Sequence, residues 1–203
     1  MGNLTEAIKH LLIINVLMYF GTNAFMGDSR LMLAMFYPAS DFFRPYQIVT
    51  HMFMHADLGH LMFNMLTLFF LGQWVERVWG MRRFVFFYLF AGLGAALTHL
   101  VFMYYEINYL GELGAMNVPV LGASGAVYGV LVAFAVLFPN QRLMLLFPPI
   151  PIKAKYLAMG LIVIDLFYGI SGVGSNVAHF AHLGGALFGY LLIRYWYKFG
   201  SRL

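Results

Sequence analysis

The residue best placed to do chemistry is Ser124, which stands where a glycine-rich loop runs into an apolar stretch, within Val118–Gly129. The first backbone N–H groups of a helix have no partner inside the helix, and the helix dipole favours negative charge at that end. The oxyanion that forms when a hydroxyl attacks a carbonyl needs this environment. The sequence therefore predicts that Ser124 is a nucleophile, provided that the chain supplies a base.

The candidate base is His182, which lies in the segment Ala-His-Leu-Gly-Gly at 181–185. A serine and a histidine form a nucleophile and a general base only within hydrogen-bond reach of each other. Small residues four positions apart let two membrane helices cross closely. Both stretches carry such ridges, formed by Gly125 and Gly129 in the first and by Ala181, Gly185 and Gly189 in the second. A crossing through these ridges brings Ser124 and His182 to one junction, and a bulky residue in the first ridge is expected to separate them.

Two further polar residues, His60 and Asn64, lie four positions apart and so share one face of a predicted helix. Like Ser124 and His182, they fall a few residues below the outer end of a helix, at a depth of about 5–10 Å. Polar side chains at that depth normally face protein or a water-filled cavity. They are predicted to donate hydrogen bonds to the oxyanion, together with the backbone N–H of Ser124.

A metal site is the alternative use for the histidines. His51 and His55 have the spacing of ligands on one helix face, and His179 and His182 are also close in the sequence. However, the sequence has no His-Glu-x-x-His pattern and no cysteine, and carboxylates are scarce near these positions. The prediction is a site with no metal ion and no organic cofactor.

The composition predicts the elements that position these residues. Of the 203 residues, 62% are hydrophobic and only 10% are charged, so the chain cannot form a water-soluble surface. A spanning helix needs about 20 mostly apolar residues, and the chain offers roughly six such stretches with little left over. The predicted fold is an all-α, polytopic membrane bundle that forms a single domain over residues 1–203. The expected spans are Ala7–Met26, Leu58–Val75, Phe84–Tyr104, Val120–Phe138, Ala154–Ile170 and Ala178–Tyr195.

The charge distribution orients the predicted bundle. Ten of the twelve lysines and arginines fall on the side that holds both chain ends, and only Arg30 and Arg44 fall on the other side. Because positively charged connections stay in the cytoplasm, both termini are predicted to be cytoplasmic. The candidate site then lies near the outer face, the lipid bilayer is the expected environment, and no nucleic-acid partner is predicted.

The connections carry further structural predictions. The outer connection from Gly27 to Asp57 is too long to be structureless in a compact protein, so we expect helices lying in the membrane interface. Arg44 within it is interpreted as a structural anchor, with contact to a lipid headgroup as the alternative. Glu76 and Arg77 are expected to form an ion pair at the cytoplasmic end, and the proline-rich connection 139–153 cannot be helical throughout.

Three motifs occur in a fixed order along the chain: His60-x-x-x-Asn64 after a Thr-His-x-x-x-His run that ends at His55, Gly-Ala-Ser-Gly at 122–125, and Ala-His-Leu-Gly-Gly at 181–185. Together they resemble the rhomboid family of intramembrane serine proteases, in its six-span prokaryotic form. The resemblance implies that Ser124 and His182 act as a dyad without an aspartate, and that Tyr128 packs against the His182 ring. It also implies structural roles near the site for Gly122, His55 and Arg44. The role of Arg44 follows from the pair Phe43-Arg44, which looks like the family's Trp-Arg element.

The resemblance further implies the reaction, which is hydrolysis of a peptide bond in or near a transmembrane segment of a single- or multi-span membrane protein. A helical peptide bond is shielded by its own hydrogen bonds, so the substrate must unwind locally before the serine attacks. Asp165, the one acid well inside a hydrophobic segment, can in principle complete a triad. By the resemblance, it is a packing or gating residue.

Two other functions remain as alternatives. A catalytically inactive relative would bind and escort membrane proteins, although such relatives typically lose the serine or the histidine. A small transporter or channel would line a through-path with polar residues, whereas these residues are confined to the outer third of the predicted bundle. The protease interpretation predicts a prokaryotic cytoplasmic membrane protein whose site opens to the outer side, and it leaves the oligomeric state open.

Overall fold

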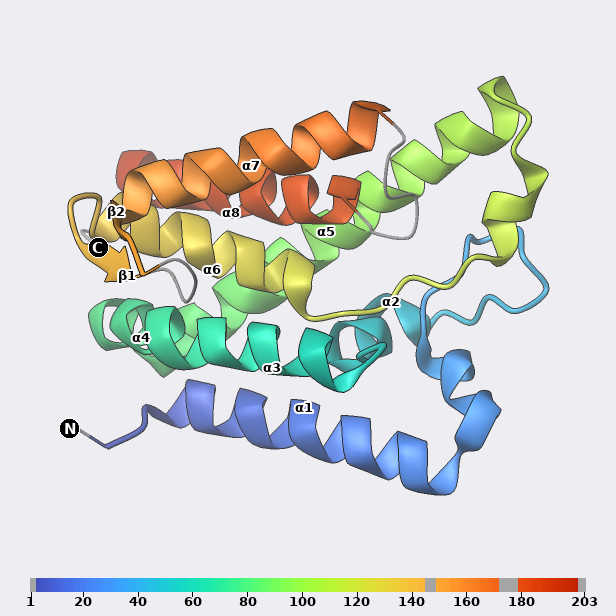
Figure 1. Cartoon of the computed structure of the whole chain (residues 1–203), viewed down its shortest axis with the longest axis horizontal. Coiled ribbons are helices and arrows are strands. Elements are labelled where there is room, and N and C mark those ends of the chain that lie inside the picture. Colours follow the sequence, from blue (N-terminus) through green and yellow to red (C-terminus); the bar gives the residue numbers. More distant parts are fainter. Residues whose placement is uncertain (1–2, 145–148, 172–178, 201–203) are drawn as a thin grey trace.

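A computed structural model describes residues 3–144, 149–171 and 179–200, which are mainly helical (Figure 1). The all-α prediction is confirmed. The one sheet among the described residues is an antiparallel pair of short strands, β1 (Arg142–Met144) and β2 (Pro151–Lys153). The α-helices are α1 (Glu6–Phe25), α2 (Gln47–Thr50), α3 (Leu58–Thr67), α4 (Gln73–Trp79), α5 (Met81–Tyr109), α6 (Ser124–Leu137), α7 (Ala154–Ser171) and α8 (His179–Phe199).

Four helices of the described chain are long and apolar enough to cross a membrane: α1, the continuous helix Leu58–Trp79, α5 and α7. The sequence predicted six such helices. α6 has only 14 residues, about 21 Å of rise, because the chain turns at Gly122 with a φ of 139° that no helix adopts. The predicted start at Val120 is therefore wrong. α8 has 21 residues but carries histidines in its first turn and a lysine in its last.

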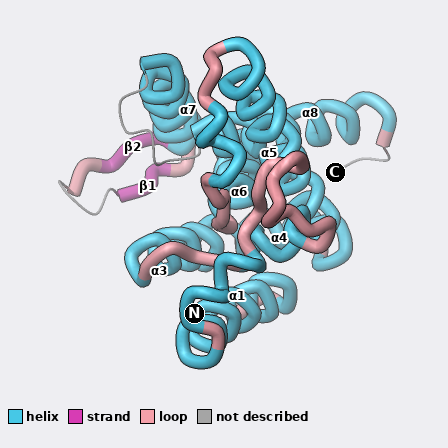
Figure 2. Tube along the Cα trace, turned by 90° about the vertical axis from the view of Figure 1, so that its right-hand side faces the viewer, coloured by secondary structure: helices cyan, strands magenta, loops and turns pink. Residues whose placement is uncertain are grey.

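α6 is the central helix of the bundle, and ten of its fourteen residues are buried. It packs against α5 and α8 and also contacts α3, α4 and α7 (Figures 1 and 2). The largest buried side chains beside it are Phe84, Phe87 and Tyr88 of α5. By contrast, α1 and α7 leave most of their apolar side chains exposed, as helices do where they face lipid. The start of α6 is therefore surrounded by protein, and it lies short of the ends of α1 and α5 (Figure 1).

The second predicted span is not a uniform α-helix. A π-helical segment, Leu68–Gly72, separates α3 from α4. This segment packs against α1, where a Cβ on Gly72 would lie 2.5 Å from Cδ1 of Ile8. The sequence pattern could not show the change, because one π turn shifts the apolar stripe without interrupting it.

The connection from Gly27 to Asp57 contains helices, as predicted, although they are short. The 3-10 helix η1 (Gly27–Leu33), α2 and the 3-10 helix η2 (His51–Phe53) follow one another, and a further 3-10 helix, η4 (Leu113–Asn117), lies in the connection between α5 and α6. The buried amide of Gln47 donates to the carbonyls of Met32 and Phe42. These bonds fold this connection onto itself beside the start of α6.

The carboxylate of Glu76 caps α1 and does not pair with its neighbour. Its two oxygens accept hydrogen bonds from the backbone N–H groups of Ala7 and Ile8, at 2.8 and 3.0 Å. The guanidinium of Arg77 instead donates to the side chain of Gln73. The predicted Glu76–Arg77 ion pair is therefore wrong, because the unpaired N–H groups at the start of α1 attract the buried carboxylate.

Candidate active site

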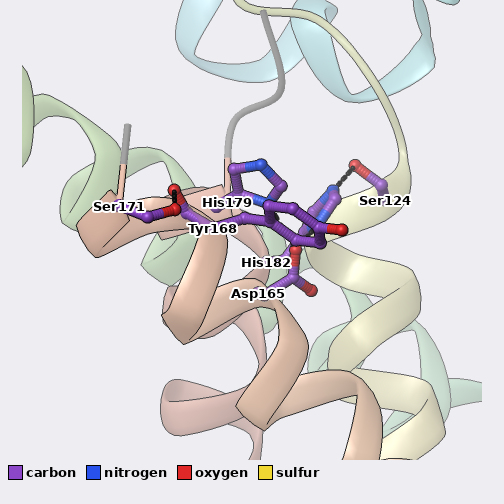
Figure 3. Close-up of polar contacts among 6 residues, drawn as sticks. All are labelled: Ser124, Asp165, Tyr168, Ser171, His179 and His182. Carbon is purple, nitrogen blue, oxygen red and sulfur yellow. Dashed lines mark hydrogen bonds and ion pairs between the residues drawn. The ribbon is translucent and has the colours of Figure 1, made fainter. Parts of the chain in front are cut away.

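Ser124 and His182 lie within hydrogen-bond reach, although 58 residues separate them in the chain. Oγ of Ser124 is 2.9 Å from Nε2 of His182, the contact that Figure 3 marks with a dashed line. The serine is the first residue of α6, and the histidine lies in the first turn of α8. The imidazole is largely buried, with 14% of its side chain exposed. The structure thus brings together the two residues that the sequence predicted to be nucleophile and base.

The glycine ridges explain how the two helices come so close. A Cβ on Gly185 would overlap the carbonyl oxygen of Gly125 and would lie 2.6 Å from its carbonyl carbon. One turn further along, a Cβ on Gly189 would lie 3.0 Å from the Cα of Gly129. Backbone therefore touches backbone along this crossing, and only glycine on α8 leaves room for it.

The glycine ridge of α6, formed by Gly125 and Gly129, also packs against α5, a contact that the sequence did not indicate. A Cβ on Gly125 or Gly129 would run into the methyl groups of Ala95 or Ala91 on α5. The expectation that a bulky residue there pushes directly against α8 is therefore incomplete. α6 is held between α5 and α8, so a side chain at either glycine displaces α6 from α5 first.

The loop before Ser124 is fixed by backbone hydrogen bonds to the connection between α1 and α3. Met35 and Val120 exchange two such bonds of 2.8 Å, and the N–H of Gly122 donates to the carbonyl of His51 at 2.9 Å. The φ of 139° at Gly122 is one that L side chains rarely adopt. A Cβ there would also lie 2.8 Å from Cε1 of His60 and 3.3 Å from Oγ of Ser124. Gly122 therefore has both a conformational and a steric reason to be glycine.

The ring of Tyr128 lies against the ring of His182. Their centroids are 4.4 Å apart and the planes differ by 10°, which is a stacked arrangement. Tyr128 lies one helical turn after Ser124 on α6, so one helix supplies both the hydroxyl and the surface that the imidazole rests on. The stacking implied for Tyr128 is therefore present in the structure.

Asp165 of α7 reaches the other side of the same imidazole. Its Oδ1 is 3.2 Å from Nδ1 of His182 and 2.6 Å from Nδ1 of His179. Its side chain is only 6% exposed, and Figure 3 shows it beneath the two histidines. The sequence treated this acid as a packing or gating residue and expected no aspartate beside the base, so the contact with His182 is a departure from that expectation.

A cavity of about 670 Å³ lies in front of the serine. Its lining comes from α3, α5, α6, α8 and the loop before α6, and it includes His60, Asn64, Ser124, Tyr128 and His182. Asn64 donates one amide hydrogen to the carbonyl of His60 at 2.9 Å, which leaves its second N–H for another acceptor. The two predicted oxyanion donors therefore face the same space as the serine.

His55 supports His60 from behind. The two imidazoles meet edge to face with centroids 5.1 Å apart, and only 3% of His55 is exposed. Burial, together with the neighbouring His60, lowers the pKa of His55 to about 4. His55 is therefore neutral at ordinary pH and can pack against His60 without repelling it as a charge.

Arg44 forms local backbone contacts. Its guanidinium donates to the carbonyls of Asp41 and Phe43 at 2.9 and 2.7 Å, and its own N–H donates to Oε1 of Gln47. These bonds fit the interpretation of Arg44 as a structural anchor. Arg44 also lines a smaller, mostly apolar cavity at the connection between α1 and α3, and Ser124 is not part of its lining.

One group of described side chains has the geometry to hold a metal ion. The ligand atoms of Asp165, His179 and His182 all lie within 4.8 Å of one another. The sequence argument that carboxylates are scarce near the histidines is therefore wrong for His179 and His182. α7 brings the carboxylate of Asp165 to both rings, although it is distant from them in the sequence. His51 and His55, the other pair considered as metal ligands, do not form such a group among the described residues. Nδ1 of His51 bonds the carbonyl of Gln47, and His55 lies beyond the end of η2, so the two do not share one helix face.

The arrangement as a whole can perform acyl transfer. Ser124 has an acceptor for its proton in His182, an unpaired helix N-terminus at its own N–H, and a cavity for a carbonyl group in front of it. Sequence reasoning missed the link from Asp165 to His179 and His182. Two signals pointed to it, namely an acid inside a hydrophobic segment and two histidines three positions apart on one helix face.

Comparison with known proteins gives consistent matches. A family model described as Rhomboid domain matches residues 43–199. Rhomboid protease AarA of Providencia stuartii is 33% identical over 151 residues, which cover 70% of this chain and 52% of that protein. Rhomboid protease GluP of Bacillus subtilis is 30% identical over 146 residues, which cover 71% of this chain and 25% of that protein. The mitochondrial Rhomboid protein 1 of Saccharomyces cerevisiae is 32% identical over 147 residues, with coverage of 71% and 40%. The matched region thus spans about half, or less, of the length of these relatives.

Proposed function

Because this chain belongs to the rhomboid family, we propose that it is an intramembrane serine protease that hydrolyses peptide bonds in or near transmembrane segments of other membrane proteins. The observation that carries the proposal is the 2.9 Å contact between Oγ of Ser124 and Nε2 of His182 at the edge of a cavity. Two of its relatives, AarA and GluP, are named rhomboid proteases.

Ser124 and His182 carry the chemistry in this proposal. Nε2 of His182 takes the proton from the Ser124 hydroxyl as the oxygen attacks the carbonyl carbon of the substrate. The protonated imidazole then donates to the departing amide nitrogen, which leaves an acyl-enzyme. Water from the cavity, deprotonated by the same nitrogen, hydrolyses the ester and restores the serine.

The negative oxygen of the tetrahedral intermediate is bound by groups around the start of α6. The backbone N–H of Ser124 lies at a helix N-terminus, and the side chains of His60 and Asn64 line the same cavity. These donors are positioned before the reaction starts, because the amide of Asn64 donates to the carbonyl of His60 and the ring of His60 rests edge to face on the ring of His55.

The protein is an integral membrane protein, as its family and its apolar helices indicate. We place it in the prokaryotic cytoplasmic membrane as one domain with six spans, both termini in the cytoplasm and the cavity open to the outer side. The basic residues on the side of the chain ends support this orientation. The short α6 fits a spanning role because protein, and not lipid, surrounds it.

Labelling with a hydroxyl-directed covalent probe tests the proposal. Purified protein in liposomes is treated with a fluorophosphonate, and the adduct is located by mass spectrometry. We expect labelling at Ser124, its loss in His182→Ala, and no change after treatment with EDTA. Labelling that persists without His182 contradicts the assigned base. Loss of labelling in EDTA contradicts the mechanism and points to a metal ion at Asp165, His179 and His182.

The stack between Tyr128 and His182 gives a prediction about ring orientation. Tyr128→Ala removes the surface against the imidazole, so kcat for cleavage of a single-span substrate should fall by about 10- to 100-fold. Tyr128→Phe keeps the stack and should lose much less activity. Both variants are compared by initial rates at saturating substrate. Equal losses in the two variants would show that the hydroxyl, and not the ring face, is what the site needs.

A further inference from the structure

α7 is attached to the rest of the bundle by few buried side chains. Only Ala154, Ala158 and Asp165 are buried along its 18 residues, and the first two lie in its first half. In its second half, the buried side chain is a carboxylic acid, 4% exposed, in an otherwise apolar part of α7. A buried charge is expensive unless it is paired and hydrogen-bonded, so the partners of this acid indicate its role.

Two imidazole nitrogens of α8 bond this carboxylate, and the hydroxyl of Tyr128 on α6 also interacts with it. An ionised carboxylate only accepts hydrogen bonds, so the nitrogens that face Oδ1, Nδ1 of His182 and Nδ1 of His179, each carry the hydrogen. A neutral histidine with hydrogen on Nδ1 has a free lone pair on Nε2. In His182, that lone pair faces Oγ of Ser124 at 2.9 Å.

This tautomer is the one that a general base requires. If the hydrogen of the neutral ring were on Nε2, the ring could not accept the proton of Ser124. The carboxylate at Nδ1 therefore selects the active form and also stabilises the imidazolium that forms during attack. The stack on Tyr128 holds the plane of the ring but does not distinguish its two nitrogens.

His179 holds the carboxylate in place. Its Nδ1 is the closer of the two donors, at 2.6 Å, and its ring lies beside the ring of Tyr168 with centroids 5.7 Å apart and a plane angle of 21° (Figure 3). Tyr168 and Asp165 are three positions apart on α7 and face α8 together. The carboxylate is thus fixed from α8 on one side and supported from its own helix on the other.

We propose that Asp165 is a positioning residue for His182, anchored by His179, so that a hydrogen-bonded chain runs from Ser124 through His182 and Asp165 to His179. This inference rests on the proposed function of Ser124 and His182 and adds to it the group that sets the state of the base. This series of hydrogen bonds links three helices, α6, α7 and α8. The base is therefore complete only while α7 lies against α8.

The test combines a spectroscopic and a kinetic measurement on Asp165→Leu, which keeps the approximate shape of the side chain and removes the acceptor. With 15N-labelled histidine, the His182 signals, assigned by their absence in His182→Ala, should show a protonated Nδ1 and an unprotonated Nε2 in the wild type. In Asp165→Leu we expect the second tautomer to appear. We also expect kcat to fall by about 10²-fold or more, with KM changed less than threefold.

Leu161→Ala is the matched control on the same helix. Leu161 packs against the hydrophobic core and has no hydrogen-bonding side-chain atom, so its truncation loosens α7 and leaves the carboxylate acceptor in place. We expect a lower melting temperature for this variant but an unchanged His182 tautomer and kcat. Equal losses of kcat in Leu161→Ala and Asp165→Leu would assign Asp165 to packing and overturn the proposal.

Further outcomes separate this inference from the proposed function. An unchanged tautomer in Asp165→Leu overturns the positioning role even if activity falls. If the wild-type protein cleaves nothing, the proposed function fails, while the tautomer shift still decides whether Asp165 controls His182. If Asp165→Leu does not fold, Asp165→Asn is the substitute, because it keeps an uncharged hydrogen-bond acceptor. It should show a kcat between those of the wild type and Asp165→Leu. A wild-type kcat in Asp165→Asn would show that the negative charge of Asp165 does not contribute to the activity of His182.

Discussion

Ser124→Ala is expected to abolish cleavage of a single-span substrate reconstituted in liposomes, with kcat reduced by at least about 10⁴-fold. The reason is that the described cavity presents one hydroxyl to His182, and alanine leaves the base without a nucleophile to activate. The fold should not change, because alanine is smaller than serine and a better helix former at the start of α6. Binding of the substrate should remain, since the cavity lining is otherwise intact.

The measurement is the initial rate of product formation on gels, with binding followed separately by co-purification of the uncleaved substrate. Ser171→Ala is the matched control, because the hydroxyl of Ser171 donates to the carbonyl of Tyr168 and lies away from Ser124 (Figure 3). It should keep activity within about twofold. Equal cleavage by the wild type and Ser124→Ala would refute the protease proposal. Binding without cleavage by the wild type would instead favour an inactive relative that escorts membrane proteins.

Gly185→Ala is the second change with a large expected effect. The added Cβ would overlap the carbonyl oxygen of Gly125, and this atom belongs to the backbone of α6 and cannot rotate away. α6 and α8 must therefore move apart, which should destabilise the protein by about 1–3 kcal/mol. It should also lengthen the 2.9 Å contact between Ser124 and His182, and a shift of about 1 Å at a reacting group can lower the rate about 10²-fold.

Gly160→Ala provides the control for this prediction. Gly160 lies in α7, and a Cβ there meets nothing within 4 Å, so the same substitution should leave the activity unchanged and raise helix stability slightly. Thermal unfolding and the rate of fluorophosphonate labelling at Ser124 measure the two effects separately. A Gly185→Ala protein that melts and labels like the wild type would show that the α6–α8 crossing has more freedom than its backbone contacts indicate.

The sequence predicted the parts of this protein that depend on local pattern and composition. The apolar content and the apolar stretches predicted a helical membrane protein, and the glycine context of Ser124 predicted a hydroxyl at a helix start. The glycine ridges predicted close contact between the helices that carry Ser124 and His182. Two helix backbones can touch only where side chains are absent, so a row of glycines indicates such a contact from the sequence alone. These features need no knowledge of how a helix is rotated within the bundle.

The sequence could not predict where polar groups find partners across the bundle. Glu76 was paired with its neighbour in sequence but caps α1, which begins about 70 residues earlier in the chain. The last apolar residues before Ser124 were assigned to its helix, but hydrogen bonds to Met35 and His51 hold them in a loop. In both places, a long-range hydrogen bond overrides the local pattern.

Asp165 shows the same limit at the candidate site. Its position inside an apolar segment marked it as unusual, but the direction of its side chain depends on the rotation of α7 about its axis and on its distance from α8. Apolar periodicity does not fix that rotation when most of a helix faces lipid and few of its side chains are buried. The sequence by itself determined which residues can do chemistry and on which helices they lie. Only the tertiary structure decided that a carboxylate stands behind His182, because three separately packed helices must meet to place it there.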